Sequence, residues 1–564
     1  MRHFPRRIVG LSAMALVACS GDPGTTTTGP ADLTSCTTSN TVPVALAVGE
    51  FRLIDPLQQS NCISLPASSS AQEYVVVAYS GYGVSSANGS SAPYALQSQA
   101  PTALASGAVG LDFGIPVVRL LAAPLTPAAF EQNLRRVERE LARSPARNFG
   151  AVAMPPAAPP VVGDRDSFNV CATTKCATFN RVGATVKYAG NPGIIYLDDQ
   201  QNAGADQFTA ADFQQLGQLF DNYLYATDTT AFGRESDINN DQHIAILMTP
   251  AVNNLTSDCS QGRVIGYTFA NDLLPFARGS NAREMFFTLS TSVATATCKA
   301  VSRSSALTAL GPTLIHELQH MISFNQHVLL RNGGDQDTWM NEGLSHFAEE
   351  LGWRTVPAAQ CASAPGGDCF SQFMSGDIND AYDYLVDPEA QYLIAPEAGD
   401  ATLAERGAAW LFIRWIADHF SADATLGSQF TRGMEQSTVL GAARVAQLTG
   451  VNFPTLVGEW QLTNWTDNLP GFSQTGLLSY SSWNFRGTFA ANFPTVFSKL
   501  FPLTPDSTTG AYSHPGTLRA GSGRTVRYPL PAGSSGVTIR MAGTLANGAL
   551  NQAIVPYLAV VRVQ

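Results

Sequence analysis

The sequence of 564 residues is poor in charged side chains and has no excess of basic ones. Only 14% of its residues are Asp, Glu, Lys or Arg, and the formal net charge at pH 7 is −11. Proteins that bind nucleic acid neutralise phosphates with clustered Lys and Arg side chains. This composition therefore argues against a nucleic-acid partner.

Beyond its N-terminus, the sequence also lacks any apolar run that is long enough to cross a membrane. The apolar stretch GAAWLFIRWIADHF, at 407–420, contains Arg414, Asp418 and His419, and it is predicted to be a core helix. The chain has no internal repeat, and it is too long for a single ordinary core. We therefore expect about three or four domains.

The N-terminus combines three arginines with an apolar run, Ile8–Ala18, whose length is typical of a signal peptide. Residues 1–18 are therefore predicted to be removed on export. The run ends in LVAC, which resembles the lipobox of bacterial lipoproteins and implies cleavage before Cys19 and acylation of that cysteine. Ser20 then favours attachment to outer-membrane lipid. The alternative is plain secretion after Ala18.

The cysteines are even in number once Cys19 is set aside, because nine occur in the chain and eight remain. An even number in an exported protein predicts disulfides. None lies in a CxxC pair, so a zinc site built from cysteines is not expected. Many pairings are open, and the one that keeps each bond within one expected domain is Cys36–Cys62, Cys171–Cys176, Cys259–Cys298 and Cys361–Cys369.

Composition divides the chain into segments. Residues 19–32 are rich in Thr, Gly and Pro and are predicted to be a flexible tether. Strand-like patterns precede a helical pattern within 126–145, and the Pro-rich stretch 154–164 follows as a linker. The expected units are a β-rich N-terminal domain with a linking helix at 33–153, a mixed central domain at 165–484, and a C-terminal β-domain at 485–564.

The stretch GPTLIHELQH carries two histidines one helical turn apart. Pro312 suits the first turn of a helix, and apolar residues at helical spacing continue it. His316 and His320 then project from one face and can converge on one ion, while Glu317 can approach the open side. This is the HExxH arrangement of zinc hydrolases, in which the glutamate is the general base. The alternative is a structural pair of histidines on an amphipathic helix.

A zinc site of this kind needs a third protein ligand. A third histidine six residues after the second is ruled out, because Gln326 stands there. His327 lies too far along the helix for the same ion, and it is predicted to be a polar surface residue. A second known spacing places a glutamate on a following helix, and Glu342 lies twenty-two residues past His320. The alternative is a first-turn glutamate that the helix dipole favours.

HELQHMISF followed by WMNEGLSHFAEE resembles the gluzincin metallopeptidases and is most similar to the hyicolysin-type family (M30). The resemblance extends over roughly 190–425 and covers neither β-region. It implies an α+β, zincin-like catalytic domain. The all-β, sandwich-like domains that we expect at both ends rest on the strand patterns alone. The resemblance also implies a secreted zinc endopeptidase with one zinc ion on His316, His320 and Glu342 and with Glu317 as base.

Many gluzincins carry an acidic residue four positions after the ligand glutamate, where this chain has His346. Either Glu349, a turn further on, supplies the carboxylate that orients a ligand histidine, or the residues around the ligands differ from that pattern. His346 itself is an alternative ligand. The resemblance also implies a Tyr or His beyond the second helix as a donor to the oxyanion. Tyr382, Tyr384 and His419 are in reach by sequence order, and Tyr384 is favoured.

The stretch DINNDQH matches the start of an EF-hand loop, because Asp237, Asn239 and Asp241 take the places of its first three ligands. No glycine stands at the sixth position, and Met248 replaces the final glutamate. A calcium site and a polar turn both remain open here.

Taken together, these features predict a monomeric, lipid-anchored endopeptidase of the cell envelope that acts on protein or peptide substrates. A further hypothesis is that the N-terminal region is a propeptide. Cleavage within 154–164 would then release the enzyme from its anchor. The alternative function is a cell-surface adhesion lipoprotein whose β-domains bind a partner and whose zinc site is vestigial. The intact Glu317 argues against that alternative, because a vestigial site no longer needs a base.

Overall fold

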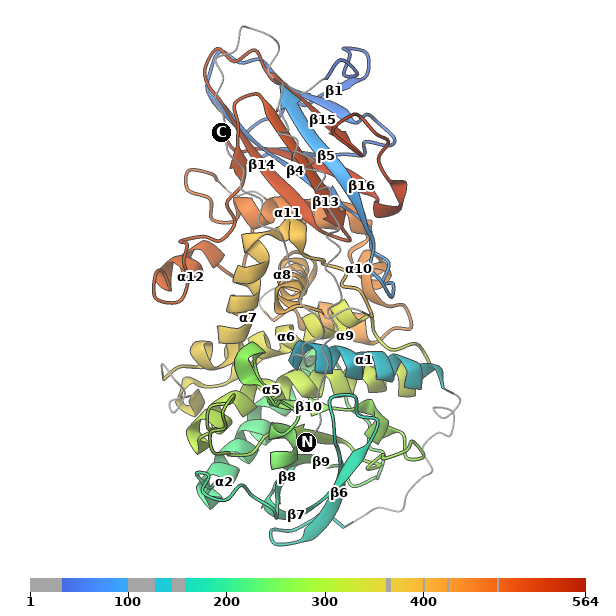
Figure 1. The fold of residues 1–564 in the computed structure, drawn as a ribbon, viewed down its shortest axis with the longest axis vertical. Helices are drawn as coiled ribbons and strands as arrows, with labels where there is room; N and C mark the ends of the chain where they lie inside the picture. The colour runs from blue at the N-terminus through green and yellow to red at the C-terminus, as the bar shows by residue number, and fades with distance from the viewer. Residues whose placement is uncertain are drawn as a thin grey trace, which may run out of the picture.

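The computed structural model describes residues 33–99, 127–144, 158–361, 367–398, 401–423, 426–473 and 476–564 (Figure 1). The predicted signal peptide, Cys19, the tether and part of the Pro-rich linker lie outside these residues. Among the described helices, none combines the length and the apolar character that a membrane crossing requires.

Two five-stranded sheets form a β-sandwich at one end of the molecule (Figure 1). Their inner faces carry the apolar side chains of a shared core, among them Val76, Ile539 and Val560. The first sheet has the order β1 (Thr41–Pro43), β3 (Cys62–Leu65), β15 (Val537–Ala542), β5 (Ser91–Gln99), β13 (Tyr512–Arg519). The second has the order β12 (Asp506–Ser507), β14 (Gly523–Leu530), β4 (Gln72–Ser80), β16 (Pro556–Arg562), β2 (Phe51–Ile54).

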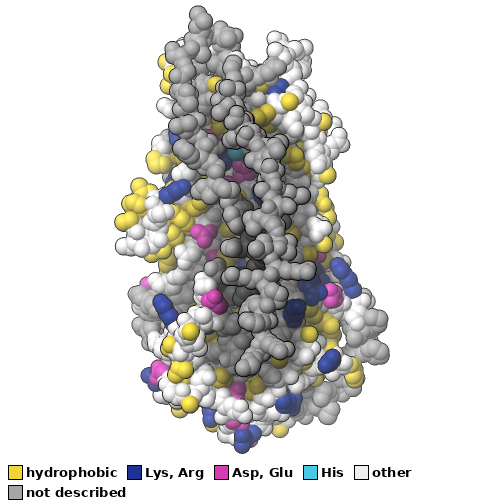
Figure 2. Space-filling model, in the orientation of Figure 1, with side chains coloured by type: hydrophobic (Ala, Val, Ile, Leu, Met, Phe, Trp, Pro, Cys, Tyr) yellow, Lys and Arg dark blue, Asp and Glu magenta, His cyan; other side chains and the backbone are white. Residues whose placement is uncertain are grey.

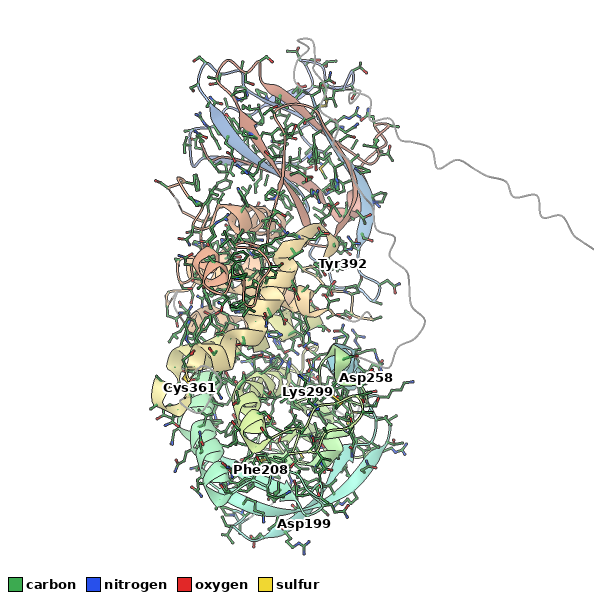
Figure 3. The ribbon with its side chains drawn as sticks, turned by 60° about the vertical axis from the view of Figure 1, so that its left-hand side comes forward. Asp199, Phe208, Asp258, Lys299, Cys361 and Tyr392 are labelled. Atoms are coloured by element: carbon green, nitrogen blue, oxygen red, sulfur yellow. A yellow bond between two sulfur atoms is a disulfide. The ribbon has the colours of Figure 1, made fainter. Side chains whose placement is uncertain are left out.

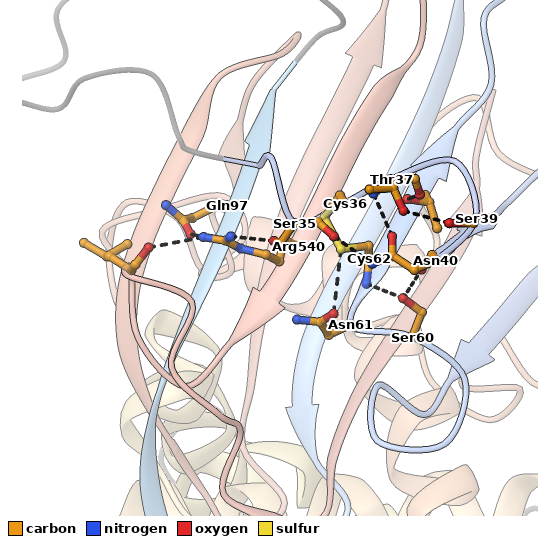
Figure 4. The surroundings of a disulfide bond; sticks show 12 residues. Ser35, Cys36, Thr37, Ser39, Asn40, Ser60, Asn61, Cys62, Gln97 and Arg540 are labelled. Atoms are coloured by element: carbon orange, nitrogen blue, oxygen red, sulfur yellow. Dashed lines mark hydrogen bonds between the residues drawn. A yellow bond between two sulfur atoms is a disulfide. The ribbon is translucent and has the colours of Figure 1, made fainter.

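This sandwich corrects the expectation of two separate β-domains, because strands from both chain ends share each sheet. β15 pairs with both β3 and β5, and β16 pairs with both β4 and β2. The side chain of Arg540 adds hydrogen bonds to Ser35 and Gln97 beside the Cys36–Cys62 disulfide (Figure 4). A sheet from one end alone would leave its apolar face in water, so the two ends fold together.

The second sheet system has six strands in the order β10 (Gly266–Thr268), β11 (Met285–Thr288), β9 (Ile244–Met248), β8 (Gly193–Asp198), β7 (Phe179–Ala189), β6 (Arg165–Cys171). β11, β9 and β8 are parallel, whereas β10, β7 and β6 run antiparallel to their neighbours. Ile246 and Leu247 on β9 face opposite cores, as the two-residue period of a strand requires. Because β10 comes first in the strand order, it is an edge strand of this sheet.

Helices fill the space between this mixed sheet and the sandwich (Figures 1 and 3). The helices that build the site are α5 (Arg303–Phe324), α6 (Thr338–Thr355), α7 (Cys369–Val386), α8 (Leu403–Phe420) and α1 (Pro127–Arg143). The others are α2 (Ala210–Leu219), α3 (Tyr225–Ala231), α4 (Pro250–Asn253), α9 (Ser428–Glu435), α10 (Gly441–Thr449), α11 (Phe453–Thr466) and α12 (Phe485–Ala491). The predicted core helix at 407–420 is confirmed as part of α8, where Trp410 and Trp415 are fully buried.

The disulfides match the sequence prediction, whereas the start of the C-terminal β-region does not. The four disulfide pairs expected from the sequence are confirmed, with Cα–Cα distances from 4.7 to 5.6 Å. The C-terminal β-region begins later than expected, because Phe485–Ala491 form α12 and the first strand starts at Asp506. Apolar side chains are exposed after α12, at Phe493, Val496 and Leu500, and hydrophobic atoms are visible on that side of the molecule in Figure 2.

Candidate metal centre

Two packed helices, α5 and α6, supply the candidate metal ligands. The Ser302 side chain caps α5 by accepting the Ser305 N–H, and the helix runs through Pro312 to Phe324. Gly343 in the second turn of α6 lies against α8, where an added Cβ would be 2.6 Å from Ile413 Cδ1. The absence of a side chain there lets α6 pack closely, which holds the neighbouring Glu342 in the interior.

The structure brings His316, His320 and Glu342 together. His316 Nε2 lies 3.8 Å from Glu342 Oε2, and His320 Nε2 lies 3.8 Å from Glu342 Oε1. One donor atom from each residue lies within 4.8 Å of the others. All three side chains are buried. Two imidazoles and one carboxylate at this spacing can hold a single divalent ion.

The other ring nitrogens of the two histidines are held by α6. His316 Nδ1 lies 2.8 Å from Glu349 Oε1, and His320 Nδ1 lies 3.0 Å from Asn341 Oδ1. Each Nδ1–H donates to an oxygen acceptor, so each Nε2 is left with its lone pair toward Glu342. The contact of Glu349 is the one that the sequence led us to expect. Asn341 was not predicted, although it directly precedes Glu342.

Charge favours an ionised Glu342 beside a neutral His320. Burial opposes ionisation of Glu342 most strongly, but Arg406, His316 and Arg135 together hold its pKa below the ordinary value. Arg406 Nη1 is 3.0 Å from Glu342 Oε2, yet neither carboxylate oxygen has a hydrogen bond within the described residues. Burial lowers the pKa of His320 well below its usual range. An anionic carboxylate and a neutral imidazole are the ligand forms of these side chains.

Glu317 faces the same site from α5. Its Oε2 accepts the Thr268 N–H of edge strand β10 at 2.8 Å, and the side chain is buried. Burial is the main cause that raises the pKa of Glu317 to about 7, against the lowering effect of His316 and Arg135. A carboxyl whose pKa lies near neutrality can both take up and release a proton.

A cavity of about 790 Å³ opens beside these residues, and His316 and Glu317 lie in its wall. The opposite walls come from α7 and from the start of α8, while Gly266 of β10 forms one edge. Its polar and charged lining side chains are Glu131, Arg263, Thr313, His316, Glu317, His346, Glu349, Gln372, Asp380, Asp383, Thr402 and Arg406. One candidate ligand, His316, and the neighbouring Glu317 therefore face this cleft, whereas His320 and Glu342 lie behind its wall.

His346 belongs to a second group of metal-ligating side chains, with His316 and Glu349. His346 Nδ1 lies 2.6 Å from Asp377 Oδ1 and 3.4 Å from Glu349 Oε1. Burial lowers the pKa of His346, but Asp377 and Glu349 raise it well above its usual range. Burial lowers the pKa of His316 too, but its hydrogen bond to Glu349 raises it above the usual value, so pKa alone does not separate the two histidines. This second group also uses the 2.8 Å contact that orients His316, so the group with Glu342 fits a metal better.

The structure does not bring the favoured oxyanion donor, Tyr384, to the site. Tyr384 is fully buried one helical turn past Asp380 on α7, where its ring stacks on Trp460 and its hydroxyl accepts from Gln461 Nε2 at 3.1 Å. Tyr382 donates to or accepts from Ser498, and His419 bonds the Ser479 carbonyl. None of the three lines the cavity. Asp380, one turn earlier on the same face of α7, does line the cavity, so Tyr384 is excluded by its position along the helix, which sequence order did not give.

His327 is likewise not the surface residue that the sequence suggested. It is completely buried, with Nε2 3.0 Å from Glu435 Oε2. Glu435 also accepts from Gln319 Nε2 at 2.8 Å, and Gln319 accepts the Ser345 hydroxyl at 2.6 Å. Ser345 Oγ lies 3.1 Å from His320 Nδ1. A buried hydrogen-bond network therefore extends from the candidate metal site to α9.

The aspartate-rich loop forms a tightly hydrogen-bonded turn. Asp237 accepts the Gln242 N–H at 3.1 Å, and Asp241 accepts the His243 N–H at 2.8 Å and the Asn239 side-chain amide at 2.6 Å. These hydrogen bonds occupy much of the acceptor capacity of the two carboxylates within the loop. Calcium binding by Asp237, Asn239 and Asp241 stays a prediction.

Comparison with known proteins gives one sequence relative of related chemistry. No protein-family model matches the chain. Over 172 residues, 30% of this chain, it is 26% identical to the neutral metalloprotease ShpI of Staphylococcus hyicus. The match spans 36% of the length of that relative. Two crystal structures of an M1 zinc metallopeptidase from Deinococcus radiodurans, one of them a mutant, align over 53% of this chain and 51% of theirs, with 16% identity and a TM-score of 0.27.

Proposed function

We propose that the protein is an exported zinc endopeptidase of the gluzincin type. The observation that carries this proposal is the convergence of His316, His320 and Glu342, with both imidazoles oriented through Nδ1 by α6. Glu317 stands next to this group and lines the same cavity. Similarity to a neutral metalloprotease supports the assignment.

The three side chains fit zinc by their chemistry. Catalytic zinc sites take three protein ligands, such as three imidazoles or two imidazoles and a carboxylate, and leave the fourth coordination place open. Neither Glu342 oxygen has a hydrogen bond in the described residues. Oε2 is ion-paired with Arg406 at 3.0 Å, so Oε1 is the oxygen that is available to an ion. When bound, zinc supplies a Lewis acid that polarises the scissile carbonyl and makes water a stronger acid.

Glu317 performs the proton transfers of the proposed reaction. One carboxylate oxygen is fixed by the Thr268 N–H, which leaves the other free to accept a proton from the attacking water. The same carboxyl then passes that proton to the nitrogen of the leaving amine. Its pKa of about 7 suits both steps.

A peptide is the substrate that the cleft accommodates best. Gly266 of edge strand β10 lies at the cavity wall, and an edge strand offers backbone N–H and C=O groups to an extended chain. The cavity is open to solvent rather than closed around a small molecule, so binding within a longer chain is sterically allowed. This is why we propose an endopeptidase.

The cellular setting is part of the proposal. Four disulfides support folding in an oxidising compartment. Attachment to outer-membrane lipid through an acylated Cys19 rests on the LVAC sequence. Because β4 lies between β14 and β16, a cut within 154–164 would leave the N-terminal strands bound in the sandwich. We therefore propose that the N-terminal region stays with the enzyme and is not discarded as a propeptide.

Digestion of casein by the purified protein, with and without a zinc chelator, tests the proposal. We expect hydrolysis that the chelator abolishes and that added zinc restores. The Glu317→Gln variant is the matched control, because it removes the base and leaves the proposed ligands in place. A wild-type protein that holds zinc but cleaves no peptide would support the alternative, an adhesion lipoprotein that binds through its sandwich.

A further inference from the structure

The α7 wall of the cavity carries two carboxylates one helical turn apart. Asp383 is exposed, whereas Asp380 is only 7% exposed, and both line the cavity that contains Glu317 and His316. Residues at i and i+3 lie on one face of a helix. The two carboxylates therefore form an acidic strip that leads from the surface toward the interior of the cleft.

Asp380 is a buried carboxylate in the α7 wall of the cavity. Within the described part of the chain, no hydrogen bond or ion pair reaches it, although the side chain is more than nine-tenths buried. Burial raises its pKa to about 7, and Glu349 and Asp383 add to the effect against the opposing charges of His346 and Arg406. Asp380 lines the cavity, so a cationic ligand in the cleft can contact its carboxylate and offset the cost of its burial.

The cationic side chains nearest to Asp380 are already engaged. Arg406 pairs with Glu131 and lies 3.0 Å from Glu342. Arg263, which also lines the cavity, donates to the Lys299 carbonyl at 2.7 Å. His346 is held by Asp377 and Glu349 on its Nδ1 side. No protein cation is therefore left to neutralise Asp380 among the described residues that line the cavity.

We propose that Asp380 and Asp383 form an anionic subsite that binds the basic side chain of a substrate Lys or Arg residue. This inference rests on the proposed peptidase function and names its substrate class. Phe373, Leu403 and Ala404 line the same cavity and offer apolar surface to the aliphatic stem. The charged head then reaches Asp380, which gains the partner that the protein does not supply.

A side chain fits this subsite better than the ammonium group of a peptide N-terminus. The carboxylate of Asp380 lies one helical turn from exposed Asp383, which is about 5 Å along α7. A flexible stem of several methylene groups can extend over that distance, whereas an α-amino group is attached directly to the bulky main chain. The cation is the shared chemistry, and the experiment below separates the two sources.

Matched internally quenched peptides, each made with an acetylated and with a free N-terminus, test the inference. Lys, Arg, norleucine or Glu is placed in turn on each side of the scissile bond, and kcat/KM is measured with the zinc-loaded protein. At one of the two positions, we expect Lys and Arg to exceed norleucine about 10-fold or more. In Asp380→Asn, we expect this ratio to fall about 10-fold, and in Asp383→Asn to fall less. Asp387→Asn, at the exposed end of α7 and outside the cavity, is the control that keeps the wild-type ratio.

Each contrary result has a distinct meaning. Equal kcat/KM for Lys and norleucine peptides in the wild type, or an equal fall for both in Asp380→Asn, overturns the subsite. An effect of Asp380→Asn that is confined to peptides with a free N-terminus assigns the cation to the ammonium group and also overturns it. If the wild type cleaves no peptide at all, the proposed function fails instead. Unchanged melting temperatures show that the variants are folded.

Discussion

Glu349 Oε1 lies 2.8 Å from His316 Nδ1, and this contact decides which ring nitrogen of the histidine faces Glu342. His316 Nε2 is thereby left 3.8 Å from the Glu342 carboxylate. Asn341 fixes His320 in the same way from about two helical turns earlier on α6. One helix thus supplies the proposed third ligand and also orients the two histidine ligands of the other helix.

Replacing Glu349 by Gln should weaken zinc binding without removing a ligand. The amide cannot carry the negative charge that holds the Nδ1–H of His316, so we expect the zinc affinity to fall about 10- to 100-fold. Competition with a chromophoric chelator measures this change. Glu140→Gln, an exposed site on α1, is the control and should bind zinc like the wild type. Equal affinities for all three proteins would contradict the orienting role.

The two overlapping metal groups make different predictions for Glu342 and His346. If Glu342 is the third ligand, Glu342→Gln should lose its zinc after dialysis, because the carboxylate provides both a donor atom and the negative charge. His346→Gln should retain about one ion per chain. Elemental analysis of both variants decides the matter. Loss of zinc from the His346 variant alone would show that the ligand assignment is wrong.

Glu317→Gln should separate metal binding from catalysis. We expect kcat to fall about 10²- to 10⁴-fold, because the amide cannot accept the proton of the attacking water, while the zinc content stays that of the wild type. Cleavage of a quenched peptide and elemental analysis on the same sample give both numbers. A variant with wild-type kcat would remove Glu317 from the mechanism.

The buried carboxyl group of Asp228 should make the free energy of unfolding depend on pH. Burial raises its pKa well above the ordinary value, and neither carboxyl oxygen has a hydrogen-bond partner in the described structure. The folded protein thus keeps this proton above about pH 4, where the unfolded chain releases it, and stability falls as the pH rises toward the folded pKa. Asp228→Asn removes that loss, so its advantage should grow by up to about 1.4 kcal/mol per pH unit.

Thermal unfolding at pH 5 and at pH 8 measures this difference. We expect a larger rise in melting temperature at pH 8 than at pH 5 for Asp228→Asn. The matched variant Asp387→Asn, at an exposed position, should change neither value. An equal shift of the Asp228 variant at both pH values would mean that packing, rather than ionisation, sets the cost of this side chain.

Local patterns in the sequence were sufficient for the helices and the disulfides. The helical spacing within 126–145 predicted α1, and Phe130 and Leu134 are indeed buried. Each disulfide joins cysteines that are neighbours in the sequence, so pairing by proximity was enough. Glu342 meets His316 because α5 and α6 are close in the sequence and pack side by side. The spacing of the two residues was therefore enough to predict this contact.

Contacts between distant segments could not be predicted in this way. Periodicity identifies a strand but not its partner, so the shared sandwich of β4 and β16 was missed. The burial of His327 depends on Glu435, which reaches it from α9. Tyr384 lies one turn past Asp380 on α7 and stacks on Trp460 of α11, a contact between helices that are far apart in the sequence. Arg406 and Asp377 are brought to the site by the packing of α8 and α7, and no sequence motif marks them.

Anomalous diffraction at the zinc absorption edge, from crystals of the purified protein, tests the central claim most directly. The account predicts one strong peak at about 2.0–2.1 Å from His316 Nε2 and His320 Nε2 and within bonding distance of a Glu342 oxygen. A peak between His316, His346 and Glu349, with Glu342 still paired to Arg406, would contradict it, as would zinc-saturated crystals with no peak at either group.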